Sequence, residues 1–545
     1  MNGPRRCIVI PAIKKNAVIP DQLVKRLAGV TLIQRAIDTA RAVAHGSDIV
    51  VVTDSQEITL VCERNGVRHH LNPSLCFTSL DIVRELRAIL TEIAQGYDHI
   101  VIYRASCPLL TWVDIDDAYA RFTASGADCL VSVKSVRHRV WEDRNGSLDA
   151  LLTEDTGDNP VYVESKALVM LTSHALHGSG AARVVPYFLN DRAIEINSYQ
   201  DWWICEKLLQ RRHIVFVVAG YPAIGMGHIF RALMLAHEIA DHKITFLCTR
   251  ESELAATNIA ARDYKTCVQE TDDLAADVLR LKPDLVINDI LNTEGDYVSR
   301  LMDAGVRVVN FEDEGEGAHR ADFVVNALYE EKHADPRFLY GHRYFCLRDE
   351  FATGERNPFR PKLGTVLITF GGTDHSDFTR KTLDVVEPLC RKHDIKVRVV
   401  AGPGYAHKEA MQNHVDTLGN PLVTFTYATN VMSRMMEGAD LAICSAGRTV
   451  YELAHMRVPA IVMAHHEREG RHTFARARNG FAYLGVMETF RPDKLRRVFA
   501  HLLVPANRQR LFDRIDRFDF TRNKAGVVRR ILGLLDATPT TTDQS

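Results

Sequence analysis

The sequence predicts an α/β protein built from several domains with parallel sheets. Apolar runs rich in Val and Ile alternate with amphipathic segments along the chain, which is typical of strands joined by crossover helices. At 545 residues the chain is too long for one hydrophobic core, so two to four domains are expected. Glycine-rich loops follow two of the apolar runs, and such loops leave backbone N–H groups free at helix N-termini. These loops are therefore the first candidates for binding an anionic ligand.

Composition argues against several partners and locations. Lys plus Arg number 67 against 69 Asp plus Glu, so no overall basic charge predicts binding to nucleic acid or to an anionic membrane. The most apolar uncharged stretch, 214–227, is interrupted by Gly and Pro and falls short of a membrane span. Eleven cysteines occur without a C-x-x-C pair, a pattern typical of reduced thiols. The apolar run near the N-terminus is too short for a signal peptide, so a cytoplasmic protein is expected.

The first 211 residues alternate strands and helices in the order expected for one α/β domain. Ligands of such domains bind at the carboxyl ends of the strands, which places the loop after Ala12 and the segment 104–110 on the functional rim. Strands are predicted at 7–12, 48–53, 99–103 and 129–133, and helices at 31–44, 79–95 and 114–124.

This part of the chain resembles the CMP-sugar synthetases, the cytidylyltransferases that activate sialic, legionaminic and pseudaminic acids. The family's opening motif lies on 10–33 without a gap, beginning at Ile10-Pro11-Ala12, and a later motif is similar to 104–110, which contains Ser106. The resemblance implies that CTP and a nonulosonic acid bind here, with Mg²⁺ on Glu195, and that the domain can form a homodimer. The residues it assigns to CTP are Pro11, Ala12, Lys14, Lys15, Lys25 and Ser106.

The triphosphate loop departs from the family pattern. Ile13, Lys15, Asn16 and Ala17 replace the Arg, Gly, Ser and Lys of the family, and the metal-binding D-I-D motif becomes the segment 195–197, Glu-Ile-Asn. A cytidylyltransferase must neutralise a triphosphate and hold a metal ion while a sugar oxygen attacks phosphorus. Two interpretations stay open: an active domain in which the lysines restore the charge, or a domain that kept the fold and lost or changed its reaction.

The second part of the chain opens with a strand, a glycine loop and a helix. The apolar run 213–219 leads into a loop containing Gly220, Pro222, Gly225 and Gly227, and a helix is predicted from His228 to residue 240. With a further strand at 244–248 these elements form a βαβ unit. An imidazole at a helix N-terminus lies where the helix dipole favours a phosphate or a developing oxyanion. The alternative is an ordinary tight turn with a solvated histidine.

Later strands of this lobe are predicted at 283–289, 305–310 and 322–326. Asp289 ends the first of them and could orient an imidazole or a water molecule. The acidic run 311–314 is expected to be a solvated loop.

A proline-containing hinge near 356–361 leads into a last lobe with two ligand-binding loops. A strand at 365–370 runs into Gly371-Gly372-Thr373, a turn that can cradle a diphosphate. A strand at 440–444 runs into a loop 445–449 and a helix that carries Glu452, whose alternative role is to satisfy the helix dipole. The run His465-His466-Glu467 is not expected to bind a metal, because neighbours in sequence do not share a helix face.

The motif G-M-G-H-I-F-R at 225–231 resembles the UDP-sugar hydrolases of pseudaminic acid biosynthesis and the spore coat polysaccharide proteins, which look like MurG-type glycosyltransferases. This resemblance implies a GT-B fold of two Rossmann-like lobes around a cleft. It assigns His228 as catalytic base, with Asp289, Asp313 and Asn326 at matching strand ends, and no metal in this half. The residues it assigns to UDP are Gly227, Gly371, Gly372, Thr373, Ser445, Gly447, Thr449 and Glu452, whereas Arg448 stands where a smaller residue is usual and His466 is a further candidate contact.

The expected organisation is a cytidylyltransferase-like domain at 1–211, GT-B lobes at 212–358 and 359–536, and a tail at 537–545. The first hypothesis is a UDP-sugar hydrolase fused to a CMP-sugar synthetase in nonulosonic acid or surface polysaccharide biosynthesis. The second is a UDP-sugar glycosyltransferase. The third is a non-enzymatic nucleotide-binding or assembly role for the first domain.

Overall fold

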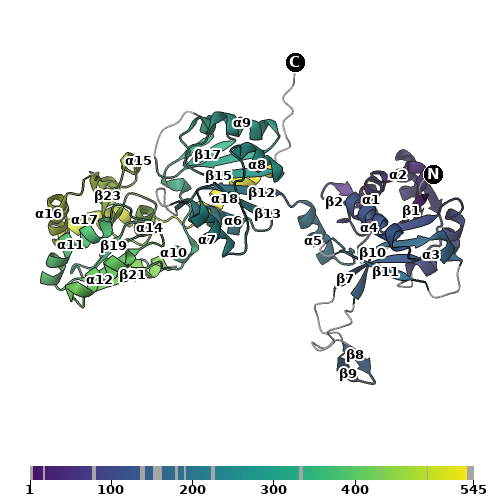
Figure 1. The fold of residues 1–545 in the computed structure, drawn as a ribbon, viewed down its shortest axis with the longest axis horizontal. Helices are drawn as coiled ribbons and strands as arrows, with labels where there is room; N and C mark the ends of the chain where they lie inside the picture. The colour runs from purple at the N-terminus through teal and green to yellow at the C-terminus, as the bar shows by residue number, and fades with distance from the viewer. Residues whose placement is uncertain are drawn as a thin grey trace, which may run out of the picture. The chain divides into compact units, whose positions relative to one another are not determined.

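The computed structural model describes residues 4–15, 19–76, 81–135, 141–150, 162–177, 182–189, 192–221, 227–329, 335–429, 431–487 and 489–536. The predicted loop residues Asn16, Ala17, Pro222 and Gly225 and the predicted tail lie outside them. The chain divides into two compact units, Met1–Arg211 and Arg212–Ser545. Both units are α/β, so the predicted fold class is confirmed (Figure 1).

The unit Met1–Arg211 has a seven-stranded sheet with a core on each face. Residues of β1 alternate between the two cores, since Ile8 and Ile10 pack with α1 and α4 while Cys7 and Val9 pack with α3. Strand order is β11 (Val184–Phe188), β7 (Cys129–Ser135), β10 (Tyr162–Thr172), β6 (His99–Tyr103), β1 (Arg6–Ala12), β4 (Ile49–Thr53), β5 (Arg68–Leu71). The helices are α1 (Leu32–Arg41), α2 (Gln56–Arg64), α3 (Ile82–Ile93), α4 (Trp112–Ser125) and α5 (Tyr199–Leu209), and β8 (Trp141–Arg144) pairs with β9 (Ser147–Ala150).

This sheet is not purely parallel, which differs from the predicted arrangement. Strand β10 lies antiparallel between β6 and β7, whereas the other pairs are parallel. The direction of a strand follows from its long-range partners, which its own apolar pattern does not contain.

The second unit begins with a lobe whose seven strands are all parallel. Its strands alternate between two cores, so the sheet is buried on both faces. Strand order is β14 (Lys265–Val268), β13 (Lys243–Cys248), β12 (His213–Val218), β15 (Leu285–Asp289), β16 (Arg307–Phe311), β17 (Phe323–Asn326), β18 (Phe338–Tyr340). Its helices are α6 (Gly227–Glu238), α7 (Glu253–Ala260), α8 (Leu274–Arg280) and α9 (Gly295–Asp303).

The next lobe has a six-stranded parallel sheet reached through the short helix α10 (Asp349–Ala352). Strand order is β21 (Val423–Tyr427), β20 (Lys396–Ala401), β19 (Thr365–Thr369), β22 (Leu441–Ser445), β23 (Ala460–Ala464), β24 (Phe481–Val486). Its helices are α11 (Phe378–Lys392), α12 (Lys408–Leu418), α13 (Met432–Met436), α14 (Thr449–His455), α15 (Glu467–Gly470), α16 (Pro492–Leu503) and α17 (Pro505–Ile515).

The last helix, α18 (Asn523–Asp536), returns to the first of these lobes. Val527 and Ile531 pack in the same core as Ile214 of β12, and Figure 1 shows this yellow helix among the teal elements. Lys524 pairs with Glu238 of α6 at 2.5 Å. The predicted lobe 359–536 is therefore too long by one helix, because the apolar side of α18 is covered by the other lobe.

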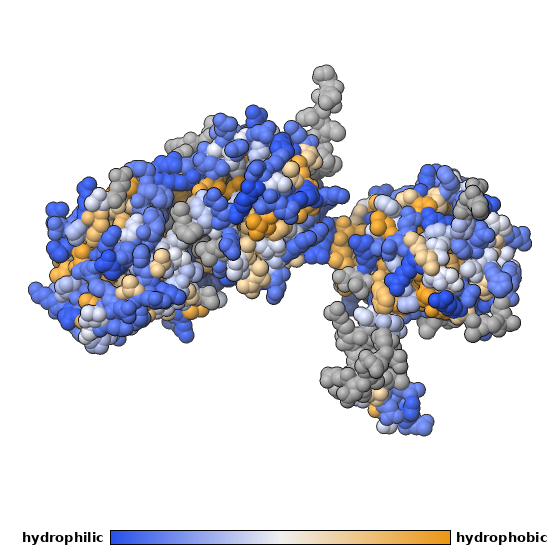
Figure 2. Space-filling view, in the orientation of Figure 1, coloured by the Kyte–Doolittle hydropathy of each residue, from blue (hydrophilic) through white to orange (hydrophobic). Residues whose placement is uncertain are grey.

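The surface of the lobes is mainly polar. Hydrophilic residues cover most of the visible face of this unit in Figure 2. Within the described residues, no helix has the length and apolar character needed to cross a membrane. All eleven cysteines are free thiols.

Candidate functional site

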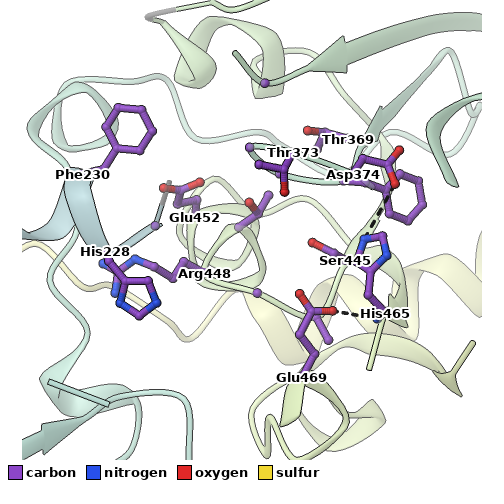
Figure 3. Close-up of a pocket in the computed structure, with 18 of the residues that line it drawn as sticks. His228, Phe230, Thr369, Thr373, Asp374, Ser445, Arg448, Glu452, His465 and Glu469 are labelled. Atoms are coloured by element: carbon purple, nitrogen blue, oxygen red, sulfur yellow. Dashed lines mark hydrogen bonds and ion pairs between the residues drawn. The ribbon is translucent and has the colours of Figure 1, made fainter. Parts of the chain in front are cut away.

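The carboxyl ends of strands from both lobes border one cavity of about 330 Å³. The glycine loops reach it from opposite sides, as Figure 3 shows for His228 on α6 and Ser445 at the end of β22. The residues predicted from sequence that line the cavity are Gly227, His228, Gly371, Gly372, Thr373, Ser445, Gly447, Thr449 and Glu452. The structure thus brings together three loops, at Gly227, Gly371 and Ser445, that lie far apart in the chain.

The predicted base His228 and the predicted carboxylate Asp289 contact each other directly. His228 lies in the first turn of α6 and is 7% exposed, and its Nδ1 is 2.5 Å from Oδ1 of Asp289 at the end of β15. Because Asp289 occupies Nδ1, the tautomer with a proton on Nδ1 is favoured and Nε2 can accept one. Within the described residues Nε2 makes no hydrogen bond. His228 can therefore act as a general base.

Arg231 fixes the same carboxylate from the next turn of α6. Its Nε donates to Oδ2 of Asp289 at 2.7 Å and a terminal nitrogen donates to Oδ1 at 2.5 Å. Burial alone would raise the pKa of Asp289, but the charge of Arg231 and the hydrogen bonds from Arg231 and His228 outweigh it and hold that pKa below the ordinary value. Asp289 is consequently ionised when it orients the imidazole.

Glu312 completes this buried cluster, which corrects the expectation of a solvated acidic loop. Its Oε1 accepts a hydrogen bond from Arg231, and its side chain is buried. Burial raises the pKa of Glu312, but the positive charges of Arg231 and Arg448 outweigh it and lower that pKa. The backbone of Glu312 has a φ of +53°, which is strained for a residue other than glycine. Strained residues of this kind cluster at functional sites, where the backbone fixes the direction of a side chain. A carboxylate directly after a buried strand was the sequence signal for this role.

The matching positions Asp313 and Asn326 do not line the cavity. Asp313 holds the loop together, since its carboxylate accepts from the backbone N–H and the hydroxyl of Thr293 at 3.0 and 2.6 Å and from Nδ2 of Asn310 at 2.6 Å. Asn326 is fully buried at the end of β17. Leu291, at the family's tyrosine position, lines the cavity with a φ of +70°.

The first nucleotide-loop candidate is a tight turn after β19. Gly371 has a φ of +79°, and a Cβ on Gly402 of the neighbouring strand end would lie 2.5 Å from Cα of Gly372. Asp374 follows the turn and accepts from the backbone N–H groups of Phe378 and Thr379 at the start of α11, at 2.9 and 2.8 Å. The turn is thus held between a second backbone and a helix start.

The second candidate loop is followed by α14, which carries Glu452. This carboxylate is 7% exposed and accepts a hydrogen bond from Nε of Arg348 at 3.0 Å. Arg348 also pairs with Glu350 at 2.7 Å. Arg348 was not predicted, because nothing in its local sequence shows that the interlobe segment folds against α14.

The segment after β23 gives the cavity a half-buried carboxyl group. Oε2 of Glu469 accepts from the backbone N–H of His465 at 2.8 Å, and burial raises the pKa of Glu469 to about 7. Burial lowers the pKa of His465 to about 4, so this imidazole is neutral near pH 7. His466 lines the cavity and accepts from the backbone N–H of Glu469 at 3.4 Å.

Two arginines of the same segment cross to the other lobe. Arg468 donates to Oδ1 of Asn292 at 2.9 Å and to the carbonyl of Glu312 at 2.6 Å. Arg471 forms a bidentate pair with Glu314 at 2.8 and 2.5 Å. These contacts link the two lobes on one side of the cavity, and the Arg471–Glu314 pair among them is partly exposed.

Two of the residues assigned to CTP in the first unit, Lys14 and Lys25, have protein partners. Nζ of Lys14 pairs with Glu57 at 2.5 Å and Asp21 at 3.2 Å, and Nζ of Lys25 lies 5.3 Å from the ring centre of Trp202. Lys15 is exposed, and Pro11 and Ala12 are buried at the end of β1. Lys14 is therefore already neutralised, which does not favour the prediction that it restores charge for a triphosphate.

The surroundings of Glu195 do not fit Mg²⁺. Its Oε1 pairs with Arg104 at 2.8 Å and accepts from Oγ of Ser106 at 3.4 Å. Within the part of the chain that the structure describes, no three His, Cys, Asp or Glu side chains gather as a metal site. A carboxylate already paired with a guanidinium is less available to a hard cation, which does not favour Mg²⁺ at Glu195. Binding of Mg²⁺ there stays a prediction.

The comparisons with known proteins support the interpretation of the second unit. Residues 365–509 match the model of the glycosyltransferase family 28 C-terminal domain. The chain is 26% identical over 272 residues to an uncharacterized protein of Methanocaldococcus jannaschii, a match that covers 47% of this chain and 56% of that protein. It is 25% identical over 277 residues to the spore coat polysaccharide biosynthesis protein SpsG of Bacillus subtilis, covering 48% of this chain and 80% of that protein. The lobe 365–509 is therefore glycosyltransferase-like.

Other similarities are shorter or concern the fold. The 3-deoxy-manno-octulosonate cytidylyltransferase of Koribacter versatilis is 32% identical over 78 residues, 14% of this chain and 30% of that protein. The crystal structure of MurG from Acinetobacter baumannii covers 59% of this chain and 99% of its own, with 16% identity and a TM-score of 0.45.

Proposed function

We propose that residues 212–536 bind a nucleotide sugar between the two lobes and transfer its glycosyl group to a hydroxyl acceptor. The observation that carries this proposal is the His228–Asp289 pair at the cavity wall opposite two glycine-containing loops. The glycosyltransferase family 28 match over the lobe that contains these loops supports a nucleotide-sugar donor. A UDP-sugar is the donor that the sequence resemblance implies.

The proposed step breaks the bond between the anomeric carbon and the diphosphate oxygen, which keeps the electron pair. The acceptor oxygen bonds to the anomeric carbon and its proton moves to Nε2 of His228. Asp289 stabilises the imidazolium that forms. Gly371, Ser445 and Glu452 would hold the nucleotide away from the bond that breaks, which fixes the geometry of the attack.

Hydrolysis of the same donor is the second candidate. His228 is only 7% exposed, so a water molecule reaches its ring more readily than a bulky acceptor does. The sequence motif at 225–231 also resembles that of UDP-sugar hydrolases. Both candidates use the same base and the same leaving group.

Incubation of the full chain with UDP-sugars, with and without cell-envelope sugar acceptors, tests the proposal. Release of UDP that requires an acceptor supports transfer, and release of UDP and free sugar without one supports hydrolysis. A chain that neither binds UDP nor cleaves any UDP-sugar would overturn both candidates.

Two proposals remain for the unit Met1–Arg211. In the first, the unit activates a nonulosonic acid with CMP, and in the second it binds a nucleotide without catalysing that reaction. The ion pairs of Lys14 and Glu195 favour the second. Release of pyrophosphate from CTP in the presence of a nonulosonic acid, lost in Lys14→Ala, would support the first. The name of the Bacillus subtilis relative, whose match covers 48% of this chain, supports a place in polysaccharide biosynthesis.

A further inference from the structure

Arg448 reaches from the glycosyltransferase-like lobe to the catalytic cluster of the other lobe. It directly precedes α14, and its guanidinium donates to the carbonyl of Cys346 at 3.2 Å. The same group lies 3.6 Å from Oε1 of Glu312, and its Cδ lies 3.3 Å from the position of a Cβ on Gly227. Figure 3 shows the side chain extending from its loop toward His228. Arg448 thus lies between the candidate nucleotide loops and the candidate base.

The other cavity arginines use their donors on protein groups. Arg231 makes three bonds to carboxylates, Arg348 pairs with two carboxylates, and Arg468 donates to an amide oxygen and a carbonyl. A guanidinium has five N–H donors. Among the described residues, Arg448 makes one hydrogen bond, to a neutral carbonyl, and one long ion pair. It is therefore the cavity arginine with the most unused hydrogen-bonding capacity.

The charge of Arg448 is only partly compensated, by Glu312 at 3.6 Å and by the ring of Phe345, whose centre lies 4.8 Å from the guanidinium carbon. Its side chain is 16% exposed. Burial and the nearby positive charge of Arg231 lower its pKa from the ordinary value, although it stays a cation. A partly desolvated cation with free donors favours an anionic ligand, because an added anion would supply the missing compensation.

We propose that Arg448 is a catalytic residue that contacts the diphosphate and stabilises the negative charge that develops when it leaves. The inference rests on the proposed function, since it requires a nucleoside diphosphate leaving group in the cavity. Glu312 would orient the guanidinium from the far side through its contact with Oε1. As the anomeric carbon–oxygen bond breaks, the electron pair moves to a β-phosphate oxygen, and Arg448 donates to that oxygen. A preoriented donor of this kind needs little reorganisation during the reaction.

This assignment predicts different effects on different ligands. UDP carries the charge that develops on the leaving group, whereas uridine carries none. Arg448→Ala should therefore lower kcat by about 100-fold or more and weaken UDP binding by about 10-fold or more, with uridine binding unchanged. Arg448→Lys should recover only part of the loss, because an ammonium group cannot form two parallel bonds to a phosphate. Added guanidinium ion should partly restore kcat in Arg448→Ala.

Arg471→Ala is the matched control, because Arg471 also crosses between the lobes but does not line the cavity. It should keep kcat and UDP affinity within about threefold of the wild type, since its ion pair is partly exposed. All variants are purified as the full chain and compared by thermal melting, UDP and uridine titration calorimetry, and UDP release.

Several results would overturn the assignment. Unchanged kcat in Arg448→Ala, an equal loss in Arg471→Ala, or an equal loss of uridine binding would each show that Arg448 does not act on the diphosphate. Absence of UDP binding by the wild type would overturn the proposed function as well. Binding of UDP by the wild type with no effect of Arg448→Ala would overturn only the role of Arg448.

Discussion

Nδ1 of His228 lies 2.5 Å from Oδ1 of Asp289, although the two residues are 61 positions apart in the chain. The contact joins the first turn of α6 to the carboxyl end of β15. It leaves Nε2 as the nitrogen that can take a proton in the cavity.

His228→Ala should lower turnover by about 10²- to 10⁴-fold, which is the usual contribution of a general base. UDP affinity should be retained, because all the candidate nucleotide residues except Gly227 belong to the other lobe. His237→Ala is the control, since His237 lies exposed at the end of the same helix. Steady-state UDP release and calorimetric UDP binding measure the two effects, and full activity of His228→Ala would refute the assigned base.

Asp289→Asn should destabilise the fold by about 3–5 kcal/mol near pH 7, because it leaves the buried cation Arg231 short of a partner. The folded-state pKa of Asp289 is lowered, so its contribution is fully present above the ordinary Asp pKa of about 3.9 and is lost as pH falls further. Urea denaturation of both proteins should show a constant difference from pH 7 to 5 that narrows below about pH 4. A difference that narrows as pH rises would contradict this sign.

Gly402→Ala should weaken UDP binding by at least about tenfold, because its Cβ would lie 2.5 Å from Cα of Gly372 and displace the turn. Gly526→Ala is the control, since a Cβ there meets no described atom within 4 Å and alanine favours a helix. Calorimetric UDP titration of both variants tests this, and equal affinities would show that the turn does not hold the nucleotide.

Glu452→Ala should weaken UDP binding, because it removes a cavity carboxylate and leaves Arg348 with one carboxylate partner fewer. Glu452→Gln should weaken it less, since an amide oxygen can still accept from Arg348. A loss of about 1.5–3 kcal/mol for the alanine variant corresponds to a charge-assisted hydrogen bond. Unchanged affinity for UDP would leave Glu452 with only a structural role at α14.

UDP affinity should fall between pH 6 and 8 more steeply in the wild type than in Glu469→Gln. Burial raises the pKa of Glu469 to about 7, so this cavity carboxyl is mostly protonated at pH 6 and mostly ionised at pH 8. Its negative charge would then repel the diphosphate. The glutamine variant keeps the titration of UDP itself and serves as the reference, so identical pH profiles would refute the effect.

The positions of most strands and of both candidate loops followed from local pattern. The apolar runs at 213–219 and 365–370 became β12 and β19, and the helix predicted at His228 became α6. Strands and helices could be predicted because each shows its repeat of apolar residues within a short stretch of sequence. The roles of Arg348 and Arg468 could not be predicted in this way, because their partners come from distant segments. The position of Glu312 directly after a buried strand is a local signal, but its arginine partners are also distant in the chain.

The sequence by itself determined that this protein is α/β and that its chain divides after residue 211. It also determined that His228 begins a helix after a glycine loop and that Asp289 ends a later strand of the same lobe. Only the tertiary structure decided that Glu312 is buried between two arginines, that α18 returns to the other lobe, and that Lys14 and Glu195 already have partners. The physical reason is that burial and charge compensation depend on which surfaces meet, and the meeting surfaces are brought together only when the sheets and lobes have formed.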